Sequence, residues 1–181
     1  MNRYARGLSE RGFRVVRFDF PGSRKNEPLE RAYLAVVTRV ARQFPEAPLT
    51  IGGKSMGGRI ASLIASKQSL PIRGLVFFGY PLHPPGKPEH RRDAHLPNVR
   101  VPMLFVSGTR DPFASPAELR ALTKTFGAKL MLVEGGDHSL EVPRSAKVGQ
   151  GDVDARIWDA VADFCATESR SGAARSPRRA P

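Results

Sequence analysis

The segment PLTIGGKSMGG, residues 48–58, predicts a strand that turns into a helix, because an apolar run meets a glycine-rich turn there. Residues 59–66 follow with apolar side chains at helical spacing. A chain that turns sharply from strand to helix holds a serine in a strained conformation with its hydroxyl projecting. The Gly-x-Ser-x-Gly pattern therefore predicts a nucleophile elbow. Ser55 is its nucleophile, and Gly53 and Gly57 are expected to avoid collisions between side chains.

Two further polar residues are expected beside Ser55. Asp111 follows a strand predicted over 103–107, and His138 follows one predicted over 129–133. Because the carboxyl ends of parallel strands meet at one edge of a sheet, the three side chains should lie together. Ser55 would attack a carbonyl carbon, His138 would accept and return the proton, and Asp111 would orient the imidazole. Asp137 is a poorer partner, since adjacent side chains point apart.

The order of these residues and the start of the next helix add to the hypothesis. Serine, then aspartate, then histidine is the order used by hydrolases with a strand-turn-helix elbow, and it differs from the trypsin-like and subtilisin-like orders. The backbone N–H of Met56, at the helix start, is expected to donate to an oxyanion. Each motif is weak by itself, and the combination is what predicts a catalytic triad.

Strand and helix signals alternate along the chain. The expected strands are short, apolar and bounded by glycine or proline, and they cover 14–20, 49–52, 74–79, 103–107 and 129–133. The clearest helix start is at 115–118, where SPAE combines a serine cap, a proline and a capping-box glutamate. The alternation predicts an α/β protein, a three-layer α/β/α sandwich around a mostly parallel sheet.

Length and charge limit the organisation of the chain. Its 181 residues suffice for one domain, which we place at 1–166. Residues 167–181 are rich in Arg, Ser, Ala and Pro and are predicted to be a basic, disordered tail. The net charge of +12 is spread along the chain, and no motif with interleaved aromatic residues is visible. We therefore expect no specific binding of nucleic acid.

Composition also bears on location and partners. The only cysteine, Cys165, excludes an intrachain disulfide and favours a reducing, cytoplasmic location. The densest apolar stretch, 75–78, is far too short to span a bilayer, so no membrane partner is expected. We expect no cofactor and no metal. The expected partner is a small-molecule, ester-type substrate.

The glycine-rich turn has a rival interpretation, because Gly53-Lys54-Ser55 also ends a phosphate-binding P-loop. That loop requires a glycine at position 48, which is Pro48. The phosphate-binding interpretation therefore fails. Lys54 is then expected to be a solvated side chain at the rim of the site.

Three further histidines, His83, His90 and His95, lie in a proline-rich loop over 81–96. Their spacing matches no common zinc pattern. The loop follows a predicted strand, a position from which loops reach the substrate. We expect an ordered, stiff loop that contacts the substrate or the edge of the triad.

Four segments together resemble a small branch of the α/β-hydrolase superfamily: GGKSMGGR at 52–59, GYPLHPPGKP at 79–88, GTRDPF at 108–113 and GGDHS at 135–139. The branch is similar to dienelactone hydrolases. Its eukaryotic relatives include testis-expressed hydrolase-like proteins and a hydrolase-like subunit of the non-specific lethal chromatin complex. The resemblance covers Met1 to about Cys165. It implies Ser55, Asp111 and His138 as the triad, with serine where dienelactone hydrolases use cysteine.

The N-terminus departs from this family. A second oxyanion donor normally comes from a His-Gly-x-Gly-like loop before the first helix, and the sequence has no such segment. The chain opens inside what looks like that helix, with Tyr4 and Leu8 facing inward and Gly12 at its end. The strand that the family places between 14–20 and 49–52 is missing, which would leave a gap or force those strands to pair. We hypothesise that Met1 is an internal methionine of a longer gene product.

Two functions are compatible with these observations. The first is a serine hydrolase that cleaves an ester, thioester or lactone through an acyl-enzyme intermediate, and the three triad residues favour it. The second is a catalytically impaired, hydrolase-like scaffold that binds a partner, and the missing oxyanion loop favours it.

Overall fold

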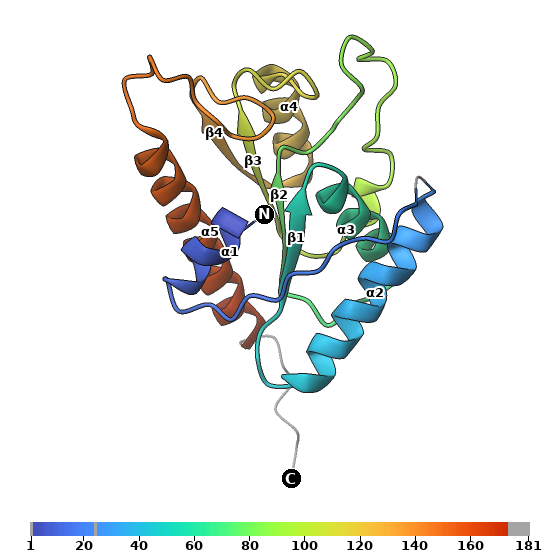
Figure 1. Cartoon of the computed structure of the whole chain (residues 1–181). Coiled ribbons are helices and arrows are strands. Elements are labelled where there is room, and N and C mark those ends of the chain that lie inside the picture. The colour runs from blue at the N-terminus through green and yellow to red at the C-terminus, as the bar shows by residue number, and fades with distance from the viewer. Residues whose placement is uncertain (1, 24, 174–181) are drawn as a thin grey trace.

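The computed structural model describes residues 2–23 and 25–173, and the four strands within these residues form one parallel sheet. The strands pair in the order β1-β2-β3-β4 (Figure 1). Strand and helix alternate as the sequence predicts, so the α/β fold class is confirmed. The elements are α1 (Asn2–Ser9), α2 (Asn26–Gln43), β1 (Thr50–Lys54), α3 (Met56–Lys67), β2 (Gly74–Phe78), the 3-10 turn η1 (Leu96–Asn98), β3 (Met103–Gly108), α4 (Pro116–Phe126), β4 (Lys129–Val133) and α5 (Gln150–Ala173).

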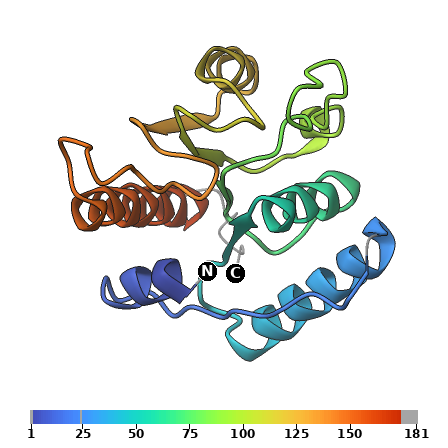
Figure 2. The ribbon, with the colours of Figure 1, turned by 45° about the horizontal axis from the view of Figure 1, so that its top comes forward.

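The sheet is covered on both faces, which makes three layers. Successive side chains of a strand point to opposite faces, so Leu75 and Phe77 of β2 enter one core and Val76 and Phe78 the other. The first core is closed by α2, α3 and α4, and the second by α1 and α5. Figure 2 shows α1 beside α5 on one side of the sheet, with α2 and α3 on the other. Burial on both faces explains why β2 and the first four residues of β3 are apolar.

Helix boundaries follow from local sequence. At α4, the Ser115 side chain accepts from the Glu118 N–H and the Glu118 side chain accepts from the Ser115 N–H, so the predicted capping box is present. Gly127 ends the helix in the left-handed conformation with φ 60°. At α1, Tyr4 is buried as expected, and Gly7 lets the helix pack directly on Trp158 of α5.

The strand predicted over 14–20 is wrong. The segment makes no ladder with a neighbouring strand and crosses in front of the sheet as an extended chain. Two of its aromatic residues nonetheless pack, because the Phe18 and Phe20 rings lie 5.0 and 6.0 Å from the ring of Tyr33 on α2. β-branched and aromatic residues favour extended backbone, but a strand also has to lie in register beside another strand, and segment 14–20 packs on α2 instead. Segment 14–20 and β1 do not pair directly.

Tyr33 occupies the edge of β1 that segment 14–20 does not reach. Its hydroxyl accepts from the Gly52 N–H at 3.0 Å and donates to the Gly52 carbonyl at 2.5 Å. One buried side chain thereby satisfies both backbone groups of a residue in an edge strand. Burial raises the pKa of Tyr33 well above its ordinary value, so its hydroxyl remains neutral and can donate.

The C-terminal boundary also differs from the expectation. Helix α5 continues to Ala173, so the first residues of the tail predicted over 167–181 are helical. Its remaining residues, 174–181, lie outside the described residues. None of the helices in the described part of the chain is long and apolar enough to cross a membrane.

Replacing Tyr33 with phenylalanine tests the role of its hydroxyl. The change leaves the ring in place but removes both hydrogen bonds to Gly52, and we expect a loss of about 1–3 kcal/mol in the free energy of unfolding. Urea unfolding measures the total loss. Native-state hydrogen exchange should show the Gly52 amide losing more protection than the Leu75 amide, whose acceptor is the Pro102 carbonyl. Equal changes at the two amides would contradict the local role.

Candidate active site

Ser55 lies at the turn between β1 and α3 in a strained backbone conformation. Its φ of 51° and ψ of −117° place a non-glycine residue at positive φ, which costs about 1–3 kcal/mol. The Ser55 N–H donates to the Phe78 carbonyl at the end of β2, at 2.9 Å, and the Ser55 carbonyl accepts from the Arg59 N–H in the first turn of α3. Bonds to both neighbouring elements hold the strained turn in place.

Two glycines make the turn possible, but they are Gly53 and Gly58 and not the predicted pair of Gly53 and Gly57. A Cβ on Gly53 would lie 2.7 Å from the Gly57 carbonyl carbon, and a Cβ on Gly58 would lie 2.8 Å from the Gly53 carbonyl oxygen. A Cβ on Gly57 would meet only the Phe20 ring, at an ordinary contact distance of 3.8 Å. Gly53 and Gly58 therefore permit the close approach of strand and helix. The steric role expected for Gly57 is wrong, since its own side-chain space is open.

The structure brings Ser55, Asp111 and His138 into one hydrogen-bonded row. Ser55 Oγ is 2.8 Å from His138 Nε2, and His138 Nδ1 is 2.9 Å from both carboxylate oxygens of Asp111. A carboxylate only accepts, so Nδ1–H donates to Asp111 and neutral Nε2 is free to accept from the serine hydroxyl. The Asp111 side chain is fully buried and that of His138 is 20% exposed.

Two donors support the Asp111 carboxylate beyond His138. The Phe113 N–H donates to Oδ1 at 2.9 Å, and the Ser107 hydroxyl donates to Oδ2 at 3.3 Å. Neither donor is among the site residues that the sequence predicts. The Phe113 contact is an Asx turn, a signal that Asp111-Pro112-Phe113 carries locally. Ser107 lies at the end of β3, and nothing in the sequence shows that its hydroxyl faces the aspartate.

Close backbone contacts bring the histidine loop to the elbow. A Cβ on Gly108 would lie 2.1 Å from the Gly136 carbonyl oxygen, and one on Gly79 would lie 2.7 Å from the His138 carbonyl oxygen. The ends of β2 and β3 thus give the loop after β4 room to fold over them. Asp137 accepts from the Ser139 and Glu141 N–H groups, so this carboxylate serves the loop itself rather than His138.

The surroundings of the row are partly apolar. The Phe113 ring lies 4.2 Å from the His138 ring at an interplanar angle of 32°. Met56, at the first position of α3, has an exposed side chain. Its N–H has no acceptor four residues earlier within the helix, so this donor is available beside the Ser55 hydroxyl. The helix dipole adds positive potential at the same place.

Lys54 is not the solvated rim residue that we expected. Its ammonium group donates to the Ser139 hydroxyl at 2.7 Å, and the side chain is half-buried. The elbow and the histidine loop are therefore joined twice, once through residues 55 and 138 and once through residues 54 and 139.

The three histidines of the proline-rich loop bind residues outside the row of Ser55, Asp111 and His138. His83 is buried with Nε2 3.3 Å from Glu118, His95 Nε2 is 2.7 Å from Ser62, and His90 is exposed beside Glu89. We expected this loop to contact the substrate or the edge of the triad, and none of the three histidine side chains is hydrogen-bonded to Ser55, Asp111 or His138. The link is indirect, because the His83 N–H donates to the carbonyl of Phe113, whose ring packs on His138.

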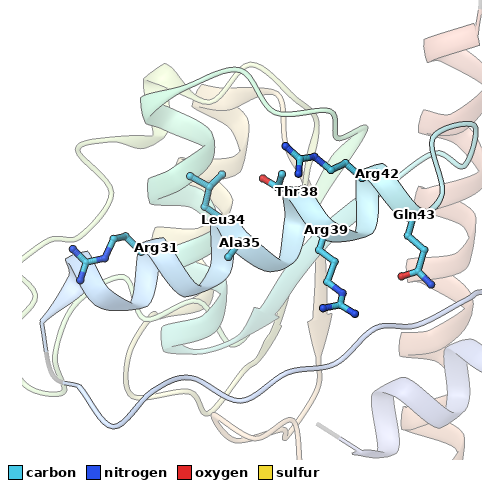
Figure 3. Close-up of a pocket in the computed structure, with 7 residues that line it drawn as sticks. All are labelled: Arg31, Leu34, Ala35, Thr38, Arg39, Arg42 and Gln43. Carbon is cyan, nitrogen blue, oxygen red and sulfur yellow. The ribbon is translucent and has the colours of Figure 1, made fainter.

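Two hollows on the surface are lined by residues outside the row. Within residues 2–23 and 25–173, no group of three or more His, Cys, Asp or Glu side chains is placed to hold a metal ion. A hollow of about 810 Å³ runs along α2, between side chains that include Arg31, Leu34 and Arg39 (Figure 3). A second hollow of about 310 Å³ lies at the end of α3. Neither is lined by Ser55, Asp111 or His138.

Comparisons with known proteins agree with this fold. A family model described as "Alpha/beta hydrolase domain" matches residues 1–166. An α/β serine hydrolase homologue from Coxiella burnetii superimposes with a TM-score of 0.68 at 17% identity, over 90% of this chain and 74% of that chain. The esterase domain of a Rhodothermus marinus protein superimposes with a TM-score of 0.64 at 18% identity, over 90% of this chain and 77% of that chain. Est1E from Butyrivibrio proteoclasticus superimposes with a TM-score of 0.70 at 18% identity, over 92% of this chain and 80% of that chain.

Alanine substitutions distinguish the two helix glycines. At Gly58 the added Cβ meets the Gly53 carbonyl, so we expect Gly58→Ala to lower the free energy of unfolding by about 1–3 kcal/mol. At Gly57 the space is open and alanine is the better helix former, so Gly57→Ala should be neutral or stabilise by up to about 1 kcal/mol. Chemical denaturation of the two variants measures the difference. Similar stabilities would show that the elbow is packed less tightly than described.

His95 makes stability depend on pH. Burial, with the Arg59 charge adding to it, lowers the pKa of His95 from 6.5 to about 4. The Ser62 hydroxyl donates to the Arg59 carbonyl, so it accepts from the Nε2–H of neutral His95. Between pH 6.5 and 4 the unfolded chain binds a proton that the folded chain does not. Stability should therefore fall as the pH falls through this window.

Glutamine at position 95 tests this dependence, because its amide can still donate to Ser62 but does not titrate. We expect His95→Gln to weaken the loss of stability between pH 6.5 and 4 and to leave stability near pH 8 little changed. Urea midpoints measured from pH 4 to 8 provide the comparison. His90→Gln is the matched control, since His90 is exposed, and the same flattening in this control would rule out a specific role for His95.

Proposed function

Because the chain belongs to the α/β-hydrolase family, we propose that it is a serine hydrolase that cleaves an ester, thioester or lactone through an acyl-enzyme intermediate. The observation that carries the proposal is the continuous row from the buried Asp111 through His138 to Ser55, with both hydrogen bonds between 2.8 and 2.9 Å. These are the contacts that a general base needs to activate a serine hydroxyl.

In the proposed reaction, Ser55 Oγ bonds to the carbonyl carbon of the substrate while its proton moves to His138 Nε2. The resulting oxyanion is stabilised by the Met56 N–H at the start of α3. The tetrahedral intermediate then breaks its bond to the leaving oxygen or sulfur, which takes the proton from His138. Water, deprotonated by His138, attacks the acyl-enzyme in the same way and releases the acid and free Ser55.

Asp111 has an electrostatic role in this scheme. Its buried carboxylate fixes the tautomer of His138 and stabilises the imidazolium that forms in each step. The donors at Phe113 and Ser107 keep the carboxylate oriented toward Nδ1. No cofactor takes part in the chemistry that we propose.

The finer assignment is also a proposal. The motifs at 52–59 and 135–139 support a place near dienelactone hydrolases, with a serine nucleophile and a small-molecule substrate. We further propose a cytoplasmic location, because the single thiol of Cys165 suits a reducing compartment. Specific binding of nucleic acid is not part of the function that we propose.

One observation favours a second candidate, a catalytically impaired scaffold that binds a partner. Among the described residues, the only oxyanion donor that we identify is the Met56 N–H. Loss of one such donor lowers turnover by about 10²-fold to 10³-fold in a serine hydrolase. A chain with the row intact and a weak oxyanion site would form the acyl-enzyme slowly.

A fluorophosphonate probe separates the two candidates. We expect the folded wild-type protein to be labelled on Ser55, Ser55→Ala to lose all labelling, and His138→Ala to be labelled at least about 10³-fold more slowly. Ser66→Ala, which removes a serine hydroxyl from the far end of α3, is the control that should label normally. Peptide mass spectrometry locates the adduct. A folded wild-type protein with no adduct on Ser55 would defeat the hydrolase proposal and favour the scaffold.

A panel of aryl esters of increasing acyl length then addresses the substrate class. Turnover that is absent in Ser55→Ala but present in Ser66→Ala would be assigned to the site. The acyl length with the highest kcat/KM would define the size of the acyl group that the surface beside Met56 accepts.

A further inference from the structure

The elbow and the histidine loop are paired at two consecutive positions. Ser55 Oγ lies 2.8 Å from His138 Nε2, and one residue earlier on the elbow Lys54 Nζ lies 2.7 Å from the hydroxyl of Ser139, one residue later on the loop. The two segments thus meet in antiparallel register. The second contact adjoins the reacting atoms but is not part of the row of the three proposed catalytic residues.

Ser139 is fixed at each of its polar groups. Its N–H donates to Asp137 Oδ1 at 2.7 Å, and its carbonyl accepts from Arg3 Nη2 at 2.5 Å and from the Tyr4 hydroxyl at 3.1 Å. Its hydroxyl accepts from Lys54. Contacts from β1, α1 and the loop itself therefore converge on the residue that follows His138.

Tyr4 connects this residue back to the elbow. Its ring stacks on Phe78 with centroids 4.5 Å apart, and the Phe78 carbonyl accepts the Ser55 N–H. Burial raises the pKa of Tyr4, so its hydroxyl stays a neutral donor to the Ser139 carbonyl. The elbow and the histidine loop are thus both linked to Phe78, the elbow through the Phe78 carbonyl and the loop through Tyr4, whose ring stacks on that of Phe78.

The loop needs such support because its backbone is strained. Leu140, next to Ser139, has a φ of 61° and a fully buried side chain. A non-glycine residue at positive φ costs about 1–3 kcal/mol and persists only where its surroundings hold it. Asp111 orients the His138 ring but does not by itself fix the backbone that carries it.

The charges distinguish Lys54 from its neighbour Arg3. The Arg3 guanidinium lies 3.6 Å from Glu141 and 3.9 Å from Asp154, so two carboxylates share its charge. For Lys54, the part of the chain that the structure describes provides a hydroxyl acceptor and no carboxylate. A charged donor makes a stronger hydrogen bond to a hydroxyl than a neutral one does.

We propose that Lys54 and Ser139 are positioning residues, whose hydrogen bond clips the histidine loop to the elbow and sets the separation of Ser55 Oγ and His138 Nε2. The kinetic consequence rests on the proposed function. Because a displacement of about 1 Å in a reacting group can cost up to about 10²-fold in rate, opening the clip should slow attack by Ser55. The clip should affect the bond-forming step and leave probe binding unchanged.

Saturation kinetics with a fluorophosphonate separate these effects. The maximal labelling rate reports attack by Ser55, and the half-saturating concentration reports binding. Lys54→Met keeps the apolar stem and removes the donor, and Ser139→Ala removes the acceptor. We expect each to lower the maximal rate about 10-fold to 100-fold, with half-saturation within about twofold of wild type. The double variant should match the slower single variant, because both remove one hydrogen bond.

Two further variants control the experiment. Ser139→Thr retains a hydroxyl and should recover most of the rate. Ser145→Ala changes an exposed serine farther along the same loop and should label as wild type does. Rates are expressed per folded molecule after thermal unfolding has confirmed that each variant is folded. A change in half-saturation for Lys54→Met alone, unchanged rates in both single variants, or multiplicative losses in the double variant would overturn the proposal.

A structural readout covers the case in which the wild-type protein is not labelled, which would defeat the proposed function but leave the clip to be judged. Crystal structures of wild type and Lys54→Met give the distance from Ser55 Oγ to His138 Nε2 directly. We expect it to stay within hydrogen-bond range in wild type and to exceed about 3.5 Å in the variant. An unchanged distance would overturn the clip independently of activity.

Discussion

The hydrogen bond from the Ser55 N–H to the Phe78 carbonyl is the contact on which the rest of the site depends. It ties a residue at positive φ to the end of the neighbouring strand and so prevents the turn from relaxing. This turn also sets the direction of α3, so that the N-terminus of the helix lies beside the Ser55 hydroxyl. Without this anchor, the strain at Ser55 would be relieved by moving the nucleophile away from His138.

Close backbone packing extends this constraint to the other two loops. Gly53 and Gly58 let α3 lie against β1, while Gly79 and Gly108 let the histidine loop lie against the ends of β2 and β3. At each place a single Cβ would displace one backbone segment from another. The site is therefore built from backbone contacts, and the side chains of the row occupy positions that those contacts set.

Several elements can be predicted from the sequence because their contacts are local or because both faces of the strand are buried. The capping box at Ser115 is a local interaction, and β2 and β3 are buried on both faces, so their apolar runs identify them without knowledge of their neighbours. Segment 14–20 is also rich in β-branched and aromatic residues but makes no ladder, because pairing depends on where a segment lies relative to a neighbouring strand and not on composition. At the β1 edge, the Tyr33 hydroxyl already satisfies Gly52.

For the site, the sequence alone determined which residues could meet. The order of Ser55, Asp111 and His138 and their places after successive strands put all three at one edge of a parallel sheet, because such strands end on the same side. How these residues are held depends on tertiary contacts, which make Gly58 and not Gly57 sterically required and bring Lys54 to Ser139. Contacts of this kind join segments distant along the chain, and their distances follow from packing, which no local pattern encodes.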